Sequence, residues 1–168
     1  MHIRKAQLTD AYDLAVVHVA SWRTTYQGII DEAYLSAMSV EDKLNQWEMI
    51  LRDGDVFVVE NEEGKIIGFG GVGPERTGSF TGYDAEVYAI YLLYPYQGKG
   101  IGRALLKRLA EFLLDEEYTS LLIWVLAENP SVHFYKAMGG TKIGEERIQI
   151  GEQFLIEHAY GWKDLRFV

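Results

Sequence analysis

Three alternating glycines join an apolar stretch to a helical pattern, and this junction restricts the fold more than any other part of the chain. Residues 86–93 are rich in β-branched and aromatic side chains, which predicts a buried strand. Residues 101–113 repeat apolar side chains at the helical period, which predicts an amphipathic helix. Between them, Gly98, Gly100 and Gly102 leave backbone N–H groups exposed at the start of that helix. The junction therefore predicts a strand, a tight loop and a helix in direct succession.

The rest of the 168-residue chain predicts further strands and helices around one hydrophobic core. Apolar and alternating patterns predict strands at 2–6, 56–60, 65–72, 119–126, 142–150 and 153–162, and helical patterns predict helices at 11–26, 31–37, 41–51 and 130–138. Hairpins and crossover connections are mixed in this order, which indicates an α/β (α+β) fold with a mixed sheet and helices on both faces. We expect a single domain over residues 1–168.

Composition excludes several classes of function. The chain has no cysteine, so disulfides, thiolate metal sites and cysteine nucleophiles are absent, and its four histidines are too scattered to predict a zinc site. A net charge of -9 disfavours nucleic acid and anionic membranes as partners. The same charge fits a cationic small molecule, or serves only solubility. Without a signal peptide's apolar centre or an apolar run of about 18 residues, the sequence predicts a cytoplasmic protein.

The glycine loop favours a phosphate group as its ligand. Backbone N–H groups at a helix N-terminus attract anions, and Lys99 and Arg103 add positive charge. A Walker loop is excluded because Ile101 stands where it requires lysine, and a dinucleotide fingerprint is excluded because Arg103 stands where its third glycine belongs. A strand-to-helix turn without any ligand is the remaining alternative.

The segment Gln97-Gly98-Lys99-Gly100-Ile101-Gly102 resembles the Gln/Arg-x-x-Gly-x-Gly/Ala signature of the GNAT acetyltransferases. In that family the loop binds the pyrophosphate of coenzyme A. The preceding Ile90-Tyr91-Leu92 is similar to the strand segment whose backbone pairs with the pantetheine arm. The resemblance implies acetyl-coenzyme A as cofactor and a GNAT-type fold, with a largely antiparallel sheet of about seven strands flanked by helices on both faces.

A second motif supports the same resemblance. The segment 127–139 looks like the family pattern in which an asparagine, here Asn129, is followed six residues later by a tyrosine, here Tyr135. The resemblance implies that Asn129 contacts the cofactor and that Tyr135 protonates the departing thiolate. From the residues alone, Asn129 is also a good helix cap and Tyr135 a position that packs beside Val132.

Glu86 is the candidate general base, directly or through a water molecule. Histone-modifying relatives carry a glutamate at similar spacing, and strand alternation places Glu86 on the face of Tyr88, Ile90 and Leu92. A solvated residue at the start of a strand is the alternative. Near the end of the chain, alternation separates Glu157 from His158, without indicating which of the two faces the pocket.

The first helix supplies the candidate acceptor site. Trp22 and Tyr26 are four residues apart and form one wall for an aliphatic amine, or else pack in the core. His18, one turn earlier, is expected to be structural. The acceptor is a small-molecule or peptide amine, and the resemblance implies direct attack by its nitrogen. Because relatives often pair through the terminal strands, a homodimer is also expected.

Two other classes of function stay open. A binding module would sense acyl-coenzyme A without turnover, so its cofactor affinity would survive the Tyr135→Phe substitution. A nucleotide-dependent enzyme would use the glycine loop for ATP or NAD, although the excluded motifs count against it.

Overall fold

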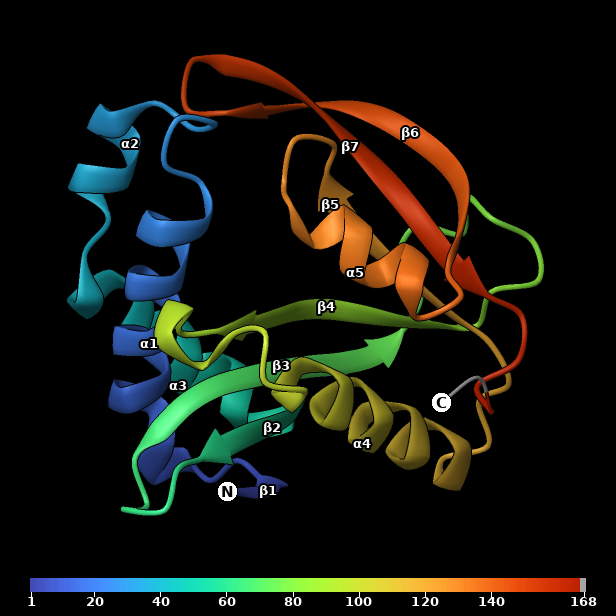
Figure 1. Ribbon diagram of the computed structural model, residues 1–168, viewed down its shortest axis with the longest axis horizontal. Coiled ribbons are helices and arrows are strands. Elements are labelled where there is room, and N and C mark those ends of the chain that lie inside the picture. Colours follow the sequence, from blue (N-terminus) through green and yellow to red (C-terminus); the bar gives the residue numbers. More distant parts are fainter. Residues whose placement is uncertain (167–168) are drawn as a thin grey trace.

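The computed structural model describes residues 1–166, which form one seven-stranded sheet with helices on both faces (Figure 1). The strands are β1 (His2–Lys5), β2 (Asp55–Glu60), β3 (Ile66–Pro74), β4 (Ala85–Leu92), β5 (Leu121–Leu126), β6 (Thr141–Ile150) and β7 (Gln153–Trp162). The helices are α1 (Ala11–Thr25), α2 (Glu32–Ala37), α3 (Val40–Asp53), α4 (Ile101–Asp115) and α5 (Ser131–Ala137), with short 3-10 turns η1 (Leu8–Asp10) and η2 (Tyr94–Tyr96).

The strand order is β1-β2-β3-β4-β5-β7-β6. Only β4 and β5 run parallel, and every other neighbouring pair is antiparallel. The predicted mixed, largely antiparallel sheet is therefore confirmed. Within residues 1–166, no helix is both long and apolar enough to cross a membrane.

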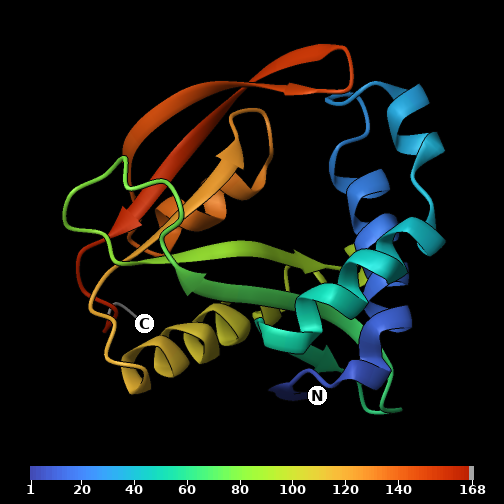
Figure 2. The same ribbon diagram turned by 180° about the vertical axis from the view of Figure 1, so that it is seen from behind.

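Each face of the sheet has its own helical layer. Helices α1 and α3 cover one face, where Leu14 and Trp47 pack against Val58 and Phe69 (Figure 2). Helices α4 and α5 cover the other, and their buried apolar side chains meet those of β2 to β5 and β7. In α4 the buried side chains follow the helical period predicted from the sequence: Ile101, Leu105, Leu106, Leu109, Ala110 and Leu113. Each fully buried leucine contributes about 1.5–3 kcal/mol to the free energy of unfolding.

The sheet splits between β4 and β5. These strands pair only over residues 85–87 and 121–123, and β4 continues beyond this point without a partner on that side. The paired end is held by Asp84, whose carboxylate accepts hydrogen bonds from the backbone and side chains of Thr119 and Ser120 at 2.8–3.0 Å. The other end is open, and in Figure 1 β5 and the β6–β7 hairpin curve away from β4.

A β-bulge marks the start of the split. Val72 of β3 pairs with Val87 and Gly71 pairs with Ala89, so Tyr88 is an extra residue in β4. A bulge bends its strand, which turns β4 away from β5. It also inverts the alternation of side chains. Glu86 therefore lies on the α1 side of the sheet together with Ala89, while Ile90 and Leu92 pack on the α4 side, and the prediction that Glu86 shares their face is wrong.

The β6–β7 hairpin reaches back over the α1 side of the split. Gln153 at its turn donates a hydrogen bond to the backbone oxygen of Ile29 at 3.0 Å and accepts one from the backbone N–H of Asp31 at 3.1 Å. Figures 1 and 2 both place the hairpin tip beside the segment that joins α1 to α2. The hairpin and this segment together close one side of the opening.

Candidate active site

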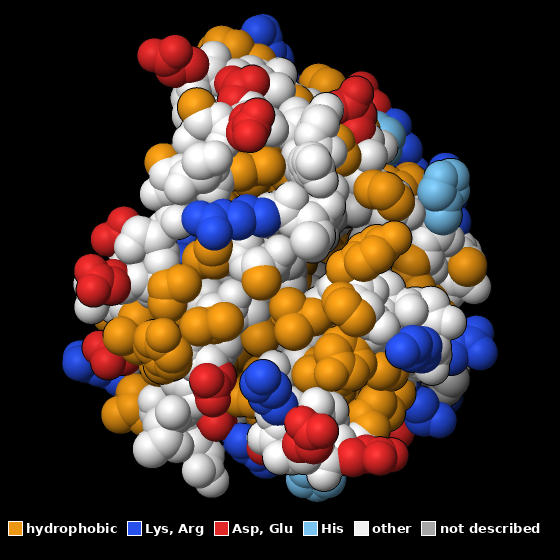
Figure 3. All heavy atoms as spheres, turned by 60° about the vertical axis from the view of Figure 1, so that its left-hand side comes forward, with side chains coloured by type: hydrophobic (Ala, Val, Ile, Leu, Met, Phe, Trp, Pro, Cys, Tyr) orange, Lys and Arg blue, Asp and Glu red, His pale blue; other side chains and the backbone are white. Residues whose placement is uncertain are grey.

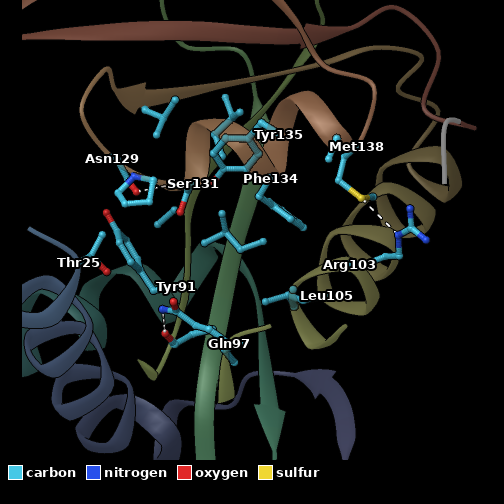
Figure 4. A pocket seen from close by; sticks show the side chains of 18 of the residues that line it. Thr25, Tyr91, Gln97, Arg103, Leu105, Asn129, Ser131, Phe134, Tyr135 and Met138 are labelled. Atoms are coloured by element: carbon cyan, nitrogen blue, oxygen red, sulfur yellow. Dashed lines mark hydrogen bonds between the residues drawn. The ribbon is translucent and has the colours of Figure 1, made fainter. Parts of the chain in front are cut away.

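A cavity of about 650 Å³ occupies the split between β4 and β5. Its walls come from the unpaired part of β4, from β5, from the first turns of α4, and from α5 along its length (Figure 4). The space-filling view shows a hollow in this part of the molecule, with hydrophobic side chains around it and most carboxylates farther out (Figure 3). The cavity therefore offers an apolar channel inside the sheet, which suits a ligand that enters lengthwise.

The glycine loop forms one end of the cavity. Gly98 and Gly100 have φ values of 70° and 79°, a region in which other residues are strained, and a β-carbon on either would meet no atom within 4 Å. Gly100 is the N-cap of α4, so unpaired backbone N–H groups and the positive end of the helix dipole gather there. The side chain of Gln97 donates a hydrogen bond to the backbone oxygen of Leu92 at 3.0 Å, which fixes the loop to the end of β4.

Most of the predicted cofactor residues line this cavity. They are Ile90, Tyr91, Leu92, Gln97, Gly98, Gly100, Gly102, Arg103 and Asn129. The other two do not: Ile101 packs in the core, and the ammonium group of Lys99 lies 5.7 Å from the ring centre of Tyr96. Arg103 is directed toward Met138, with its Nε 3.4 Å from the methionine sulfur (Figure 4). Of the two predicted positive charges, Arg103 therefore lines the cavity, whereas Lys99 lies outside it.

Tyr135 projects from α5 into the cavity (Figure 4). Its side chain is 4% exposed, and its hydroxyl has no hydrogen-bond partner within residues 1–166. Burial raises the pKa of this phenol well above its usual value, and the nearby Tyr26 adds to the effect. The hydroxyl is therefore protonated at neutral pH and free to donate a hydrogen bond to a ligand.

Asn129 combines two functions at the start of α5. Its Oδ1 accepts a hydrogen bond from the backbone N–H of Ser131, the first residue of α5, at 2.9 Å, although the N-cap position itself is Pro130. The residue is also 5% exposed and lines the cavity. Asn129 therefore positions the short helix that carries Tyr135.

Aromatic side chains from α1 and β4 form the wall of the cavity on the α1 side. The hydroxyls of Tyr26 and Tyr91 are 2.8 Å apart, and both residues line the cavity. Burial raises the pKa of Tyr26, while hydrogen bonds with Tyr91 and Asn129 oppose the rise. Trp22 stands behind this wall with its ring 4.8 Å from that of Tyr26, so only Tyr26 of the predicted pair reaches the cavity.

His18 lies outside the cavity among aromatic rings. Its Nδ1 accepts a hydrogen bond from the indole of Trp47 at 3.2 Å. Burial, together with the charge of Lys43, lowers the pKa of His18 to about 4. The residue is therefore neutral and structural at physiological pH, as its position in the sequence predicts.

Glu86 is buried, 2% exposed, and does not line the cavity. Its two carboxylate oxygens accept hydrogen bonds from the backbone N–H and the guanidinium of Arg76, and the closest contact, from Nη2, is 2.8 Å. The carboxylate in turn raises the pKa of Arg76, and the guanidinium also lies 4.0 Å from the ring centre of Tyr88. Glu86 is thus held in an ion pair whose carboxylate is buried and whose guanidinium partner is largely exposed.

Glu157 is a second carboxylate on this part of the sheet, and like Glu86 it is not among the residues that line the cavity. It lies on β7 directly opposite Leu126 of β5 and Glu146 of β6. Tyr160 and Trp162 of the same strand pack in the α4 and α5 core, so alternation places Glu157 on the α1 side. Burial, together with the charges of Glu146 and Glu86, raises the pKa of Glu157 to about 7.

Other lining residues escaped the sequence analysis. Thr25, Tyr88, Trp124 and Phe134 all line the cavity. Phe134 stands next to Tyr135 in the second motif and was the easiest to predict, whereas Trp124 depends on the point at which β5 leaves β4. Within residues 1–166, no group of three His, Asp or Glu side chains is arranged to hold a metal ion.

Comparison with known proteins shows likenesses over nearly the whole chain. The model of the Acetyltransferase (GNAT) family matches residues 18–139. The uncharacterized N-acetyltransferase YuaI of Bacillus subtilis (strain 168) is 43% identical over 163 residues, which cover 97% of this chain and 93% of that protein. The L-amino acid N-acyltransferase MnaT of Escherichia coli (strain K12) is 25% identical over 166 residues, which cover 97% of this chain and 86% of that protein. The PaiA N-acetyltransferase of Thermoplasma acidophilum, solved in complex with coenzyme A, has the same fold, with a TM-score of 0.70, 24% identity, and coverage of 93% of this chain and 96% of that chain.

Proposed function

The chain belongs to the GNAT family of acetyltransferases, and on that premise we propose that it moves the acetyl group of acetyl-coenzyme A to a primary amine by direct attack. It is an acyltransferase, and its cosubstrate is acetyl-coenzyme A. The observation that carries the proposal is the cavity in the split sheet, which has the glycine loop and the N-terminus of α4 at one end and the buried Tyr135 in its wall.

The cofactor is expected to lie along β4. Its pyrophosphate binds the backbone N–H groups around Gly98 and Gly100, with Arg103 adding positive charge. Its pantetheine arm extends beside Ile90 and Leu92, where β4 has no partner strand on the β5 side and its backbone groups on that side are available for hydrogen bonds. This placement brings the thioester to the level of Tyr135.

The transfer then needs few groups. The lone pair of the amine nitrogen attacks the thioester carbon, a C–N bond forms, and the carbonyl electrons move to the oxygen. When the tetrahedral intermediate collapses, the C–S bond breaks and Tyr135 gives its proton to the sulfur. The attacking nitrogen has to lose a proton, which restores the phenol. Tyr135 suits this role because burial keeps it protonated and its hydroxyl has no other partner within residues 1–166.

The acceptor is a small or peptide amine that enters from the α1 side, past Tyr26 and Tyr91. The relative from Escherichia coli is named as an L-amino acid N-acyltransferase, and a relative from Salmonella typhimurium as an L-methionine sulfoximine/L-methionine sulfone acetyltransferase. An amine panel should therefore hold L-methionine sulfone, L-methionine sulfoximine, 1,4-diaminobutane, benzylamine and an alanine-initiated peptide. A cytoplasmic homodimer stays a prediction.

Thermal unfolding with acetyl-coenzyme A, coenzyme A, ATP or NAD tests the cofactor, and release of free thiol in the presence of the panel tests the transfer. A ligand at about 100 times its dissociation constant adds about 2.7 kcal/mol of stability, and each kcal/mol raises the Tm of a chain of this size by about 2–4 °C. Stabilisation by the coenzyme A species alone, together with thiol release by one amine, is the expected result. Stabilisation by ATP or NAD instead would refute the proposal, and coenzyme A binding without any thiol release would favour a sensor.

A further inference from the structure

We propose that Glu157, rather than Glu86, takes the proton from the ammonium group of the acceptor. The inference rests on the acetyl transfer proposed above. A primary amine is mostly protonated at neutral pH, and only the neutral form can attack the thioester. The site therefore needs a proton acceptor where the amine arrives.

Glu157 lies on the side from which the amine enters. Its strand partner Leu126 packs in one cluster with Tyr26, and Tyr26 lines the cavity. Residues that are directly opposite in an antiparallel pair lie on the same face, so the carboxylate of Glu157 also lies on this face. The glycine loop and Tyr135 belong to the helices on the other face. The two proton-transferring groups thus stand on opposite sides of the split.

Glu157 is also available, whereas Glu86 is not. The side chain of Glu157 has no hydrogen-bond or ion-pair partner within residues 1–166. Both oxygens of Glu86 accept hydrogen bonds from Arg76, so this carboxylate already has a partner. An ammonium group near Glu86 would have to compete with the guanidinium of Arg76, whereas the carboxylate of Glu157 has no such competitor among the described residues.

The surroundings of Glu157 favour proton uptake near neutral pH. Around it stand Glu146 on β6, Glu86 with its partner Arg76 on the β4 side, and Tyr26 on α1. Burial and the two carboxylates raise its pKa to about 7. A base whose pKa is close to the working pH accepts a proton efficiently and returns it to solvent in each turnover.

The proton count is complete with this assignment. Glu157 takes one proton from the ammonium, directly or through one water molecule, and the neutral amine attacks. The second nitrogen proton replaces the one that Tyr135 gives to the sulfur. Glu157 then releases its proton to water, so the net products are the acetylated amine, free coenzyme A and one proton.

The test measures kcat/KM against pH for three glutamine variants, with the amine of the panel that the wild-type protein acetylates fastest. Glu157→Gln should lower kcat/KM at pH 7 by about 100-fold or more. The loss should shrink tenfold per pH unit toward the pKa of the free amine, because hydroxide then supplies the deprotonation. Its stabilisation by acetyl-coenzyme A should stay at the wild-type value, which shows that the variant is folded.

Two matched variants complete the experiment. Glu152→Gln removes an exposed carboxylate at the turn of the same hairpin and should leave the profile unchanged. Glu146→Gln removes a neighbouring charge and should move the inflection near pH 7 to lower pH without lowering the plateau. If the Glu157→Gln variant had the wild-type rate and pH profile, the role of Glu157 as proton acceptor would be refuted, while the proposed acetyl transfer would stand. Absence of thiol release by the wild-type protein would refute both.

Discussion

Substitution of Gly100 by alanine separates the anion-binding role of the loop from its backbone strain. Gly100 has a φ of 79° and no atom within 4 Å of an added β-carbon, so the substitution costs backbone strain but no clash. Strain of this kind costs about 1–2 kcal/mol. Gly64, in the turn between β2 and β3, has a φ of 76° and the same open space, but lies outside the cavity. Gly64→Ala is therefore a matched control for strain alone.

The two variants should differ only when the ligand is present. Without ligand, urea unfolding should show that each loses about 1–2 kcal/mol. With acetyl-coenzyme A at about 100 times the wild-type dissociation constant, the wild-type protein and Gly64→Ala should both gain about 2.7 kcal/mol. In Gly100→Ala the new methyl group stands in the space that the phosphates need, and a tenfold weaker affinity would reduce the gain to about 1.4 kcal/mol. A full gain in Gly100→Ala, or a reduced gain in Gly64→Ala, would refute this placement of the pyrophosphate.

Three further predictions concern the proposed general acid Tyr135, the buried His18 among its aromatic neighbours, and the close contact of Gly68 in β3 with β4. Tyr135→Phe should reduce thiol release by about 10²–10⁴-fold and keep the stabilisation by acetyl-coenzyme A, whereas equal loss of both would indicate a packing role only. Because the pKa of His18 is lowered from its usual 6.5 to about 4, the unfolded chain binds a proton first as the pH falls, and stability should drop by up to about 1.4 kcal/mol per pH unit between those values. Urea unfolding of His18→Gln should show a shallower dependence over this window, and an unchanged slope would contradict the assignment. Gly68→Ala would place a β-carbon 2.8 Å from the backbone oxygen of Tyr91 and should cost about 1–3 kcal/mol, while Gly71→Ala, with its nearest atom at 3.8 Å, should cost less in the same denaturation assay.

Local patterns predicted the junction well because its signals lie within a few residues of each other. The helix expected at 101–113 is α4, which begins at Ile101 and runs two residues farther, and the strand expected at 86–93 is β4 within one residue at each end. The hydrogen bond of Asn129 with the start of α5 and the helix with Tyr135 follow from the same short range of sequence. Nine of the eleven residues expected to hold the cofactor line the cavity for this reason.

Features that depend on distant segments could not be read in the same way. The bulge at Tyr88 is defined by its register with β3, and it turned Glu86 onto the unexpected face. Arg76 reaches Glu86 from a loop whose path the sequence does not reveal. The insertion of β7 between β5 and β6 brings Glu157 beside Leu126, and neither residue carries a local pattern that indicates this meeting.

The short pairing of β4 with β5 also has a mechanical consequence. Two half-sheets, β1 to β4 and β5 to β7, are joined in the sheet by three residue pairs, so the junction can act as a hinge. A ligand arm lodged between them would connect both halves, and its departure would set them free to move apart. Amide hydrogen exchange should therefore slow on both sides of the split when coenzyme A binds, at Tyr91 and at Leu126 together, and the opening of this hinge would accompany every release of product.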